Sequence, residues 1–509
     1  MLSESPIAPA SAVESAPSVA PASRMLFALF LVELIAINIA RLPESLRFDR
    51  FAFCDHGANL TLQYLTVSGM RPALDFGYHY GLLPVLIGRI WFGVFGITPL
   101  AYQAAMVLAD VLCVYALVQI IARLQMGGVA RLLLFIALAY AYQASYVNFA
   151  HATEAALLSW GLAQQARGAR SYALAFAAAA VFAKPSMGYV YGLLLLILTL
   201  RDLLRSGITW RRFIAAIAPA AAVFLILAAV VSMVFGLRTF LHTIVPLEGV
   251  TNYRALNFGL MKAGRGLWDP ARRQWILFVV DVAGFWIVSG VFLFGAALFQ
   301  LFGTSADALS SRRREMVIVC ALLHLAFLSL FFGNQWSWIY YPYILIIGIA
   351  VASDLGRYQH RIVFALCIVA VVSYTDLAYW CNRWWRTTTP DVATAQLWAP
   401  PAEKREWLTV RALARDQRSV LLDDMGAAEL MFPGFEKPVS LYLTGGLMQP
   451  SDVSRKVDQL SHAEIAIVPT TIEACSGVPD APEFREALNS FDLAWEGKYF
   501  EVFRRRATR

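Results

Sequence analysis

The feature that most constrains the fold of this chain is a series of long apolar segments, which recur from near its start to about residue 380. A helix needs about 20 mostly apolar residues to cross the hydrocarbon core of a bilayer. Hydrophobic residues make up 59% of the 509 residues and charged residues only 15%. A typical soluble domain contains roughly a quarter charged residues. The sequence therefore predicts an α-helical polytopic membrane protein and argues against a soluble globular one.

By this length criterion we expect about eleven membrane-spanning helices, several of them short between residues 150 and 200. The expected spans are residues 25–42, 99–122, 131–150, 153–166, 171–185, 187–200, 213–236, 276–302, 315–333, 339–355 and 362–380. Residues 81–97 are also apolar but contain Pro84, Gly88 and Arg89, so we interpret them as an interfacial or re-entrant helix. Residues 1–24, rich in Ala, Pro and Ser, predict a disordered cytoplasmic tail, followed by an uncleaved signal anchor.

Basic residues indicate the orientation of these spans. Arginines gather in alternate short connections, for example Arg123 with Arg131, and Arg312 to Arg314. Cytoplasmic loops carry such an excess, so the net charge of +7 reports topology and not a nucleic-acid partner. The pattern places residues 43–98 and 237–275 outside. The Ala- and Arg-rich, Lys-poor composition suggests a bacterial source, with the chain in the inner (cytoplasmic) membrane and its outer face in the periplasm.

From residue 382 to the end the apolar runs shorten and charged residues return. Strand-like and helical segments alternate there, which is typical of a small α/β domain. The expected strands are 419–422, 439–443, 464–468 and 499–503, and the expected helices 402–414, 452–460 and 482–490. We therefore predict a tail over 1–24, a transmembrane domain over 25–381 and a periplasmic α/β domain over 382–509.

The polar stretch Phe53–Arg89 in the first outer loop is the first candidate for chemistry. Asp55 begins an amphipathic segment at the outer membrane surface, where an Asp is either a catalytic carboxylate or a helix cap. Asp75 is either a turn residue or part of a substrate site. It precedes an aromatic tract from which we take further candidates for substrate contact, namely Tyr78, His79 and Tyr80.

Three further candidates lie near expected span ends. His151 and Glu154, in the outer link between the third and fourth spans, are expected either to line the same cavity or to begin a helix that Thr153 caps. Lys184, at the outer end of the fifth span, is expected either to contact a phosphate or to extend toward the headgroups.

The outer loop 237–275 is basic, against the usual charge rule. Its cations include Arg254, Lys262 and Arg265. Arginine forms forked hydrogen bonds to phosphate oxygens, so one interpretation is an anionic ligand such as a lipid phosphate. The other is contact with anionic headgroups. The sequence leaves both open.

The order of these features resembles the GT-C superfamily of polytopic glycosyltransferases, which includes the aminoarabinose transferases of lipid A and the protein O-mannosyltransferases. The shared features are a first span, an outer loop with an early acid, the tract D-F-x-Y-x-Y-G-x-L-P over Asp75–Pro84, an interfacial helix and an outer C-terminal domain. The resemblance implies transfer of a sugar from a polyprenyl-phosphate donor to a hydroxyl of a glycan, lipid or protein. It implies that Asp55 is the catalytic acid, and that His56 stands where many members have a second acid.

This chemistry needs few groups. A carboxylate such as Asp55 accepts the proton of the acceptor hydroxyl, and cations or donors stabilise the departing phosphate. The chain contains no G-x-x-x-x-G-K-[ST] loop for a nucleotide. No cofactor is required, although a divalent metal near Asp55 and His56 is left open. The expected donor-phosphate ligands are Lys184, Arg254, Lys262 and Arg265.

Two other functions compete with an inverting hexosyl- or pentosyltransferase. One is a transporter or flippase of lipid-linked glycans, and the other is a non-catalytic membrane assembly protein. Transporters often have internal repeats and broken helices around a site at the membrane midplane. Here the acids gather at one membrane face and we find no repeat, which favours an enzyme that works on that face.

Overall fold

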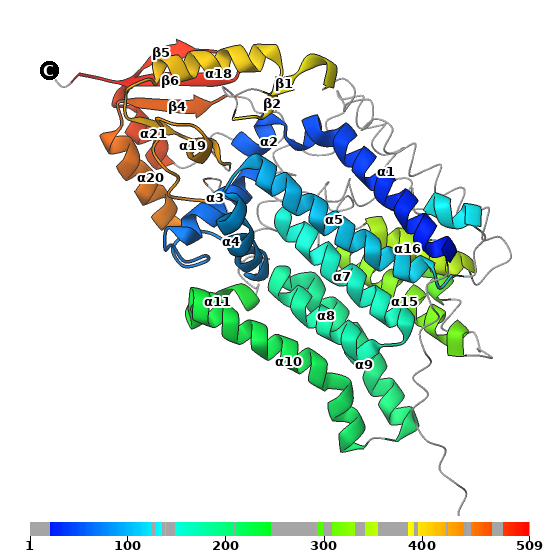
Figure 1. Ribbon diagram of the computed structural model, residues 1–509. Helices are drawn as coiled ribbons and strands as arrows, with labels where there is room; N and C mark the ends of the chain where they lie inside the picture. Colours follow the sequence, from blue (N-terminus) through cyan, green and yellow to red (C-terminus); the bar gives the residue numbers. More distant parts are fainter. Residues whose placement is uncertain are drawn as a thin grey trace, which may run out of the picture.

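A computed structural model of the chain describes residues 21–124, 128–134, 148–207, 209–245, 293–298, 308–330, 342–354, 385–390, 395–423, 426–441, 449–470 and 482–507, together with residues 138, 291 and 443. The fold is mostly helical, with a mixed β-sheet near the C-terminus. Figure 1 shows the helices packed side by side and the sheet at one end of them. The sheet domain and the bundle meet at the outer loop that holds Asp55.

The bundle is built from long helices, three of which, among the described residues, are long and apolar enough to cross a membrane: Pro99–Ile121, Pro185–Arg205 and Trp210–Phe235. The helices are α1 (Pro21–Ser45), α5 (Pro99–Ile121), α7 (Phe149–Arg167), α8 (Arg170–Ala183), α9 (Pro185–Ser206), α10 (Trp210–Phe235), α15 (Ala308–Leu330) and α16 (Pro342–Asp354). After α10 comes a short amphipathic helix, α11 (Leu237–Ile244). Each of these eight bundle helices, counted among the described residues, overlaps an expected span. Much of span 131–150, most of 276–302 and all of 362–380 lie outside the described residues, so the count of eleven stays a prediction.

Local sequence signals explain where several of these helices begin and end. Thr98 accepts a hydrogen bond from the Ala101 N–H, 3.2 Å away, and Pro99 follows it as the first residue of α5. Gly168, in the left-handed conformation, ends α7. One expected boundary was wrong. The link expected at residues 151–152 is helical, because Asn148 and not Thr153 caps α7.

The segment predicted to be the first outer loop folds into three short helices, α2 (Phe48–Ala52), α3 (Asp55–Val67) and α4 (Leu83–Phe95). The last matches the expected interfacial helix. Its Val85 and Phe92 are buried, whereas Ile90 and Val94 are exposed. A helix with one covered and one open apolar side suits the boundary between protein and lipid.

The C-terminal sheet has the order β3-β4-β6-β5, with β3 and β4 parallel and the other pairs antiparallel. Its strands are β3 (Ser419–Leu421), β4 (Ile465–Pro469), β5 (Phe491–Glu496) and β6 (Phe500–Arg505), and its helices are α18 (Pro401–Leu413), α19 (Ala428–Met431), α20 (Pro450–His462) and α21 (Pro482–Leu488). A two-stranded antiparallel ribbon, β1 (Thr389–Pro390) and β2 (Trp398–Ala399), precedes them.

Three of the four expected strands and all three expected helices of this domain are confirmed. The strand expected at 439–443 is wrong for the residues that the structure describes there (439–441 and 443). The carbonyl of Val439 accepts a hydrogen bond from the side chain of Arg455, 3.0 Å away. Strand β5 was not expected, because most of its side chains are exposed and give little apolar signal.

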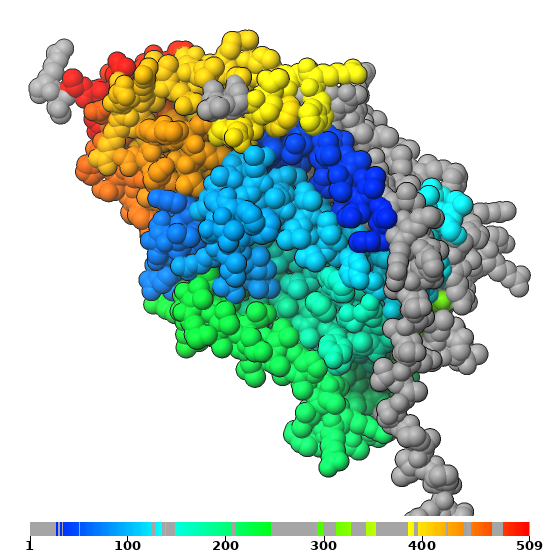
Figure 2. All heavy atoms as spheres, viewed as in Figure 1, coloured from blue at the N-terminus to red at the C-terminus, as the bar shows by residue number. Residues whose placement is uncertain are grey.

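An aromatic cluster joins this domain to the outer loop. Trp407 is fully buried, and its ring lies 5.5 Å from Phe48, 6.0 Å from Phe53 and 4.8 Å from Phe432, centroid to centroid. Aromatic pairs at this spacing contribute about 0.5–1.5 kcal/mol each beyond the area that they bury. In Figure 2 the C-terminal residues accordingly lie directly against those of the outer loop. The cluster fixes the domain over the start of α3.

Candidate functional site

Asp55 is the first residue of α3 and is half-buried. Cys54 occupies the cap position before it, in extended conformation, so Asp55 is not itself the cap. A carboxylate in the first turn is stabilised in its ionised form by the helix dipole. Cys54 is disulfide-bonded, which ties down the residue directly before the acid.

The backbone of the C-terminal domain contacts the turn that precedes Asp55. The Ala427 N–H donates to the carbonyls of Phe51 and Ala52, at 3.2 and 3.1 Å. Gly57 permits this approach, because a Cβ there would collide with the Phe51 carbonyl and lie 2.7 Å from the Ala427 nitrogen. The two segments are therefore in contact without intervening side chains at this point.

A tyrosine links the start of α3 to the start of α7. His56 Nδ1 and the Tyr102 hydroxyl are 3.0 Å apart, and the Asp55 carboxylate is close enough to Tyr102 to interact with it electrostatically. The Tyr102 ring lies 6.5 Å from that of Phe149, the first residue of α7. Asp55 and the buried polar residues of α7 thus approach the same tyrosine.

The first turn of α7 fixes the proton positions of a buried chain of polar groups. Asn148 Oδ1 accepts hydrogen bonds from the backbone N–H groups of Ala150 and His151, each at 3.1 Å. An atom that accepts those two bonds is an oxygen, so His151 Nδ1, 2.9 Å away, is the donor to it. In a neutral imidazole Nε2 is then an acceptor, and Lys184 Nζ lies 2.9 Å from it. Lys184 therefore donates to His151.

Glu154 and Tyr80 complete this cluster. Glu154 is fully buried one turn after His151 and interacts electrostatically with Lys184. The Tyr80 ring lies 5.6 Å from the His151 ring, and Lys184 Nζ lies 5.9 Å from the Tyr80 centroid. The Gly81 N–H brings this loop in by donating to the Ala183 carbonyl, 3.0 Å away. Four candidates from three segments thus lie together.

The remaining residues of the aromatic tract organise the loop itself. The side chain of Arg71 donates to both carboxylate oxygens of Asp75, at 2.9 and 3.0 Å, and holds the pKa of that carboxyl below its usual range. This supports the turn interpretation of Asp75. Tyr78 is buried and its hydroxyl donates to the Gly81 carbonyl at 2.8 Å, while His79 between the tyrosines is half-buried. Substrate contact by Asp75, Tyr78 and His79 stays a prediction.

Some candidates fall outside what the structure describes, namely Arg254, Lys262 and Arg265 in the basic outer loop. Their contact with a phosphate stays a prediction. Among the described residues no group of three or more His, Cys, Asp or Glu side chains is arranged to hold a metal ion.

Sequence reasoning missed Asn148 and Tyr102. Asn148 stands immediately before an apolar helix, which is a recognised start signal and was available in the sequence. Tyr102 gave no signal, because its partner His56 is 46 residues away in the chain.

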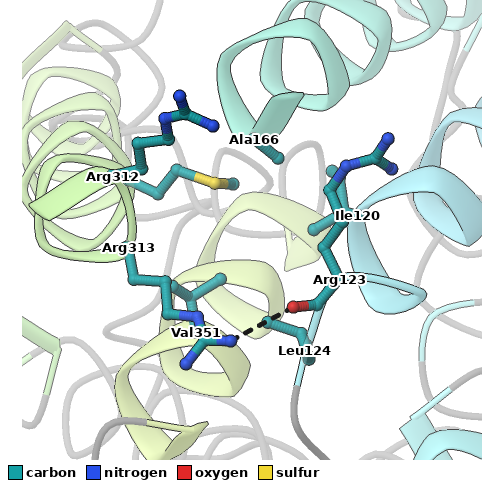
Figure 3. Close-up of a pocket in the computed structure, with 8 residues that line it drawn as sticks. Ile120, Arg123, Leu124, Ala166, Arg312, Arg313 and Val351 are labelled. Atoms are coloured by element: carbon teal, nitrogen blue, oxygen red, sulfur yellow. Dashed lines mark hydrogen bonds between the residues drawn. The ribbon is translucent and has the colours of Figure 1, made fainter. Parts of the chain in front are cut away.

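A small pocket lies elsewhere, at the opposite ends of α5 and α7 (Figure 3). Three arginines line it, Arg123, Arg312 and Arg313. Arg313 donates to the Arg123 carbonyl at 3.2 Å, just beyond the end of α5. Cations stabilise the C-terminal ends of helices, so arginines at this end have a structural role besides their effect on topology.

Fold and site together define a polytopic membrane protein whose buried polar cluster lies at one end of its helices, beneath an extramembrane domain. No family model and no curated protein matches the chain. The solved structures that are loosely similar to it include two of the same protein. ArnT from Cupriavidus metallidurans bound to undecaprenyl phosphate aligns with 93% of this chain and 97% of its own, at 14% identity and a TM-score of 0.38. The apo state of ArnT aligns over the same shares, at 13% identity and a TM-score of 0.42.

Proposed function

We propose that this chain is a membrane glycosyltransferase of the GT-C type, which moves a sugar from a polyprenyl-phosphate donor to a hydroxyl group of a glycan, lipid or protein on the periplasmic face. One observation carries the proposal. An acid at a helix N-terminus, Asp55, and a buried Lys184–His151 pair both approach the segment formed by Tyr102 and the start of α7. An acid and a cation at one end of a helix bundle are the two groups that this reaction needs.

Asp55 is the proposed general base for the acceptor hydroxyl. Its half-exposed carboxylate, ionised at the start of α3, accepts the proton of the acceptor hydroxyl while that oxygen forms a bond to the anomeric carbon of the sugar. His56, held by Tyr102, and Cys54, held by its disulfide, restrict the carboxylate from both sides in the chain. A base held in this way loses little freedom when the acceptor arrives.

Lys184 is the proposed ligand of the donor phosphate. The bond between the anomeric carbon and the phosphate oxygen breaks, and its electron pair leaves with the polyprenyl phosphate. One ammonium hydrogen of Lys184 is directed at His151 Nε2, and the positive charge of the ammonium group attracts the phosphate oxygens. Attack on the sugar face opposite the phosphate inverts the anomeric centre. The undescribed Arg254, Lys262 and Arg265 are assigned to the same phosphate on sequence grounds alone.

Two observations support an active face outside the cytoplasm. Disulfides persist in oxidising compartments such as the periplasm, and Cys54 is disulfide-bonded next to Asp55. At the other end of α5 and α7 lie Arg123, Arg312 and Arg313, as expected for a cytoplasmic face. No specific observation favours the flippase, whose site must open to both faces.

The test is replacement of Asp55 with Asn in the full-length, detergent-purified protein. Because a general base contributes roughly 10²- to 10⁴-fold, the expected rate of transfer falls by about that factor. Release of polyprenyl phosphate from a panel of polyprenyl-phosphate sugars measures turnover for any acceptor. Asp458→Asn, an exposed acid of the outer domain with 77% side-chain exposure, is the matched control. Wild-type turnover in Asp55→Asn would show that the base lies elsewhere.

A further inference from the structure

The outer domain forms hydrogen bonds to the first outer loop at a second place, distinct from the contact beside Asp55. This second contact is made by α20 and involves residues that no catalytic step above uses. Gln449 Nε2 donates to the Ala73 carbonyl at 3.4 Å. The Gly77 N–H donates to Asp452 Oδ2 at 3.3 Å, and Arg455 donates to the Asp75 carbonyl.

Asp452 binds this loop through its buried carboxylate. It is fully buried, and Oδ2 accepts the N–H of Gln449 at 2.9 Å as well as that of Gly77. Its Oδ1 accepts from Arg455 at 2.7 Å. A buried carboxylate is costly unless it is paired and hydrogen-bonded, and burial here raises the pKa of Asp452. Such a group is stable only while its partners, including the loop, stay in place.

The loop connects this contact to the part of the site proposed to bind the donor phosphate, namely Lys184 and His151. Only a few residues separate Gly77 from Tyr80, and the bond from Tyr78 to the Gly81 carbonyl closes the segment between them. Tyr80 lies against His151 and Lys184. A shift at Gly77 therefore reaches Tyr80, which lies against the residues proposed to receive the donor phosphate.

The same helix is also connected to the other half of the site. Lys456 of α20, almost fully buried, forms an ion pair with Glu429 of α19. Ala427, directly before α19, contacts the turn that precedes Asp55. α19 and α20 thus form one body with a contact on each half of the proposed site.

We propose that α20, through Asp452 and Arg455, is a positioning element that sets the placement of the Tyr80 loop relative to Asp55, and so the alignment of acceptor base and donor phosphate. This inference rests on the proposed function for its kinetic consequence but not for its structural one. Misplacement of catalytic groups by about 1 Å can cost roughly 10²-fold in rate.

The test uses Arg455→Met and Asp452→Ala in the full-length protein. Hydrogen exchange of residues 71–81, followed by mass spectrometry, measures the hold on the loop without any sugar transfer. We expect exchange there to become at least about tenfold faster in both variants, with the helices of the bundle unchanged. For transfer we expect kcat to fall about ten- to hundredfold and donor KM to change less than about threefold, because Lys184 and His151 stay paired.

Controls separate positioning from general damage. Arg506→Met removes an exposed ion pair with Asp492 in the same domain and is expected to change neither measurement. Arg455→Lys keeps the positive charge but not the forked geometry of the guanidinium group, and is expected to restore part of kcat. Turnover is normalised to the fraction that binds donor, which corrects for unfolded protein. Unchanged exchange in both variants, or faster exchange with wild-type kcat, overturns the proposal. A wild-type protein that transfers no sugar refutes the proposed function, while the exchange result still tests the hold on the loop.

Discussion

Lys184 and Glu154 interact electrostatically in a buried site, so the loss of stability on replacing one of them depends on the charge of the other. Both are more than nine-tenths buried. Removing one member of a buried pair leaves an uncompensated charge and costs about 3–5 kcal/mol, whereas removing both can be nearly neutral. A loss of activity in Lys184→Gln alone would therefore mix instability with a lost phosphate contact.

The double variant Lys184→Gln/Glu154→Gln separates the two effects. We expect Lys184→Gln to lower the thermal melting temperature and the double variant to recover most of it. Donor affinity is expected to stay weak in both, because a charge-assisted hydrogen bond is worth about 1.5–3 kcal/mol, or roughly 10- to 150-fold in affinity. Binding of labelled polyprenyl-phosphate sugar checks this.

The matched control is Lys498→Gln, which removes an exposed lysine lying 5.1 Å from the Tyr499 ring centroid. It removes the same type of lysine–tyrosine contact at a position remote from the site, so donor affinity should be unchanged. If the double variant regained wild-type donor affinity, Lys184 would have no role at the phosphate.

At the level of secondary structure, the sequence predicted elements far better than contacts. Helix α20 was predicted because its sequence is amphipathic, and strand β4 because it is a short continuous apolar run. Strand β5 was missed because most of its side chains are exposed. Tyr80, His151 and Lys184 were each chosen singly. Nothing local shows that His151 and Lys184, 33 residues apart, form a hydrogen bond, or that Gly77 bonds to a residue 375 positions later. Side-chain contacts of that range depend on the packing of whole elements.

Gly57 shows how one missing side chain permits the contact between α3 and the outer domain. Alanine favours a helix over glycine by about 1 kcal/mol. At Gly57, however, a methyl group would collide with backbone atoms of Phe51 and approach that of Ala427. Backbone cannot move aside as a flexible side chain can, so steric overlap is expected to outweigh the gain in helix propensity.

We therefore expect Gly57→Ala to destabilise the protein by about 1–3 kcal/mol, the usual cost of overpacking. Gly93→Ala in α4 is the matched control, since a methyl group there would meet nothing within 4 Å. It should be neutral or stabilising by up to about 1 kcal/mol. Melting of the purified variants, with sugar transfer measured in parallel, gives the comparison. Equal melting temperatures would mean that the domains can separate without cost.

For the molecule as a whole, the described helices carry different chemistry at their two ends. Asp55, His151 and Lys184 lie at one end, beneath the outer domain. At the other, Arg170 bonds to Asp202 at 2.6 Å and to Glu315 at 2.7 Å, joining α8, α9 and α15. The structure separates the two ends by the length of α9, about 33 Å at 1.5 Å per residue.

This polarity predicts which residues face the periplasm, and cysteine labelling in intact bacterial cells tests it. Asp458→Cys in the outer domain should react with a membrane-impermeant maleimide. Arg205→Cys, exposed at the far end of α9, should react only after permeabilisation, because arginine-rich ends stay in the cytoplasm. The parent chain sets the background, since Cys113 and Cys320 are free but buried. The reverse labelling would place Asp55 in the cytoplasm, where the Cys54 disulfide would not persist and the proposed periplasmic transfer could not occur.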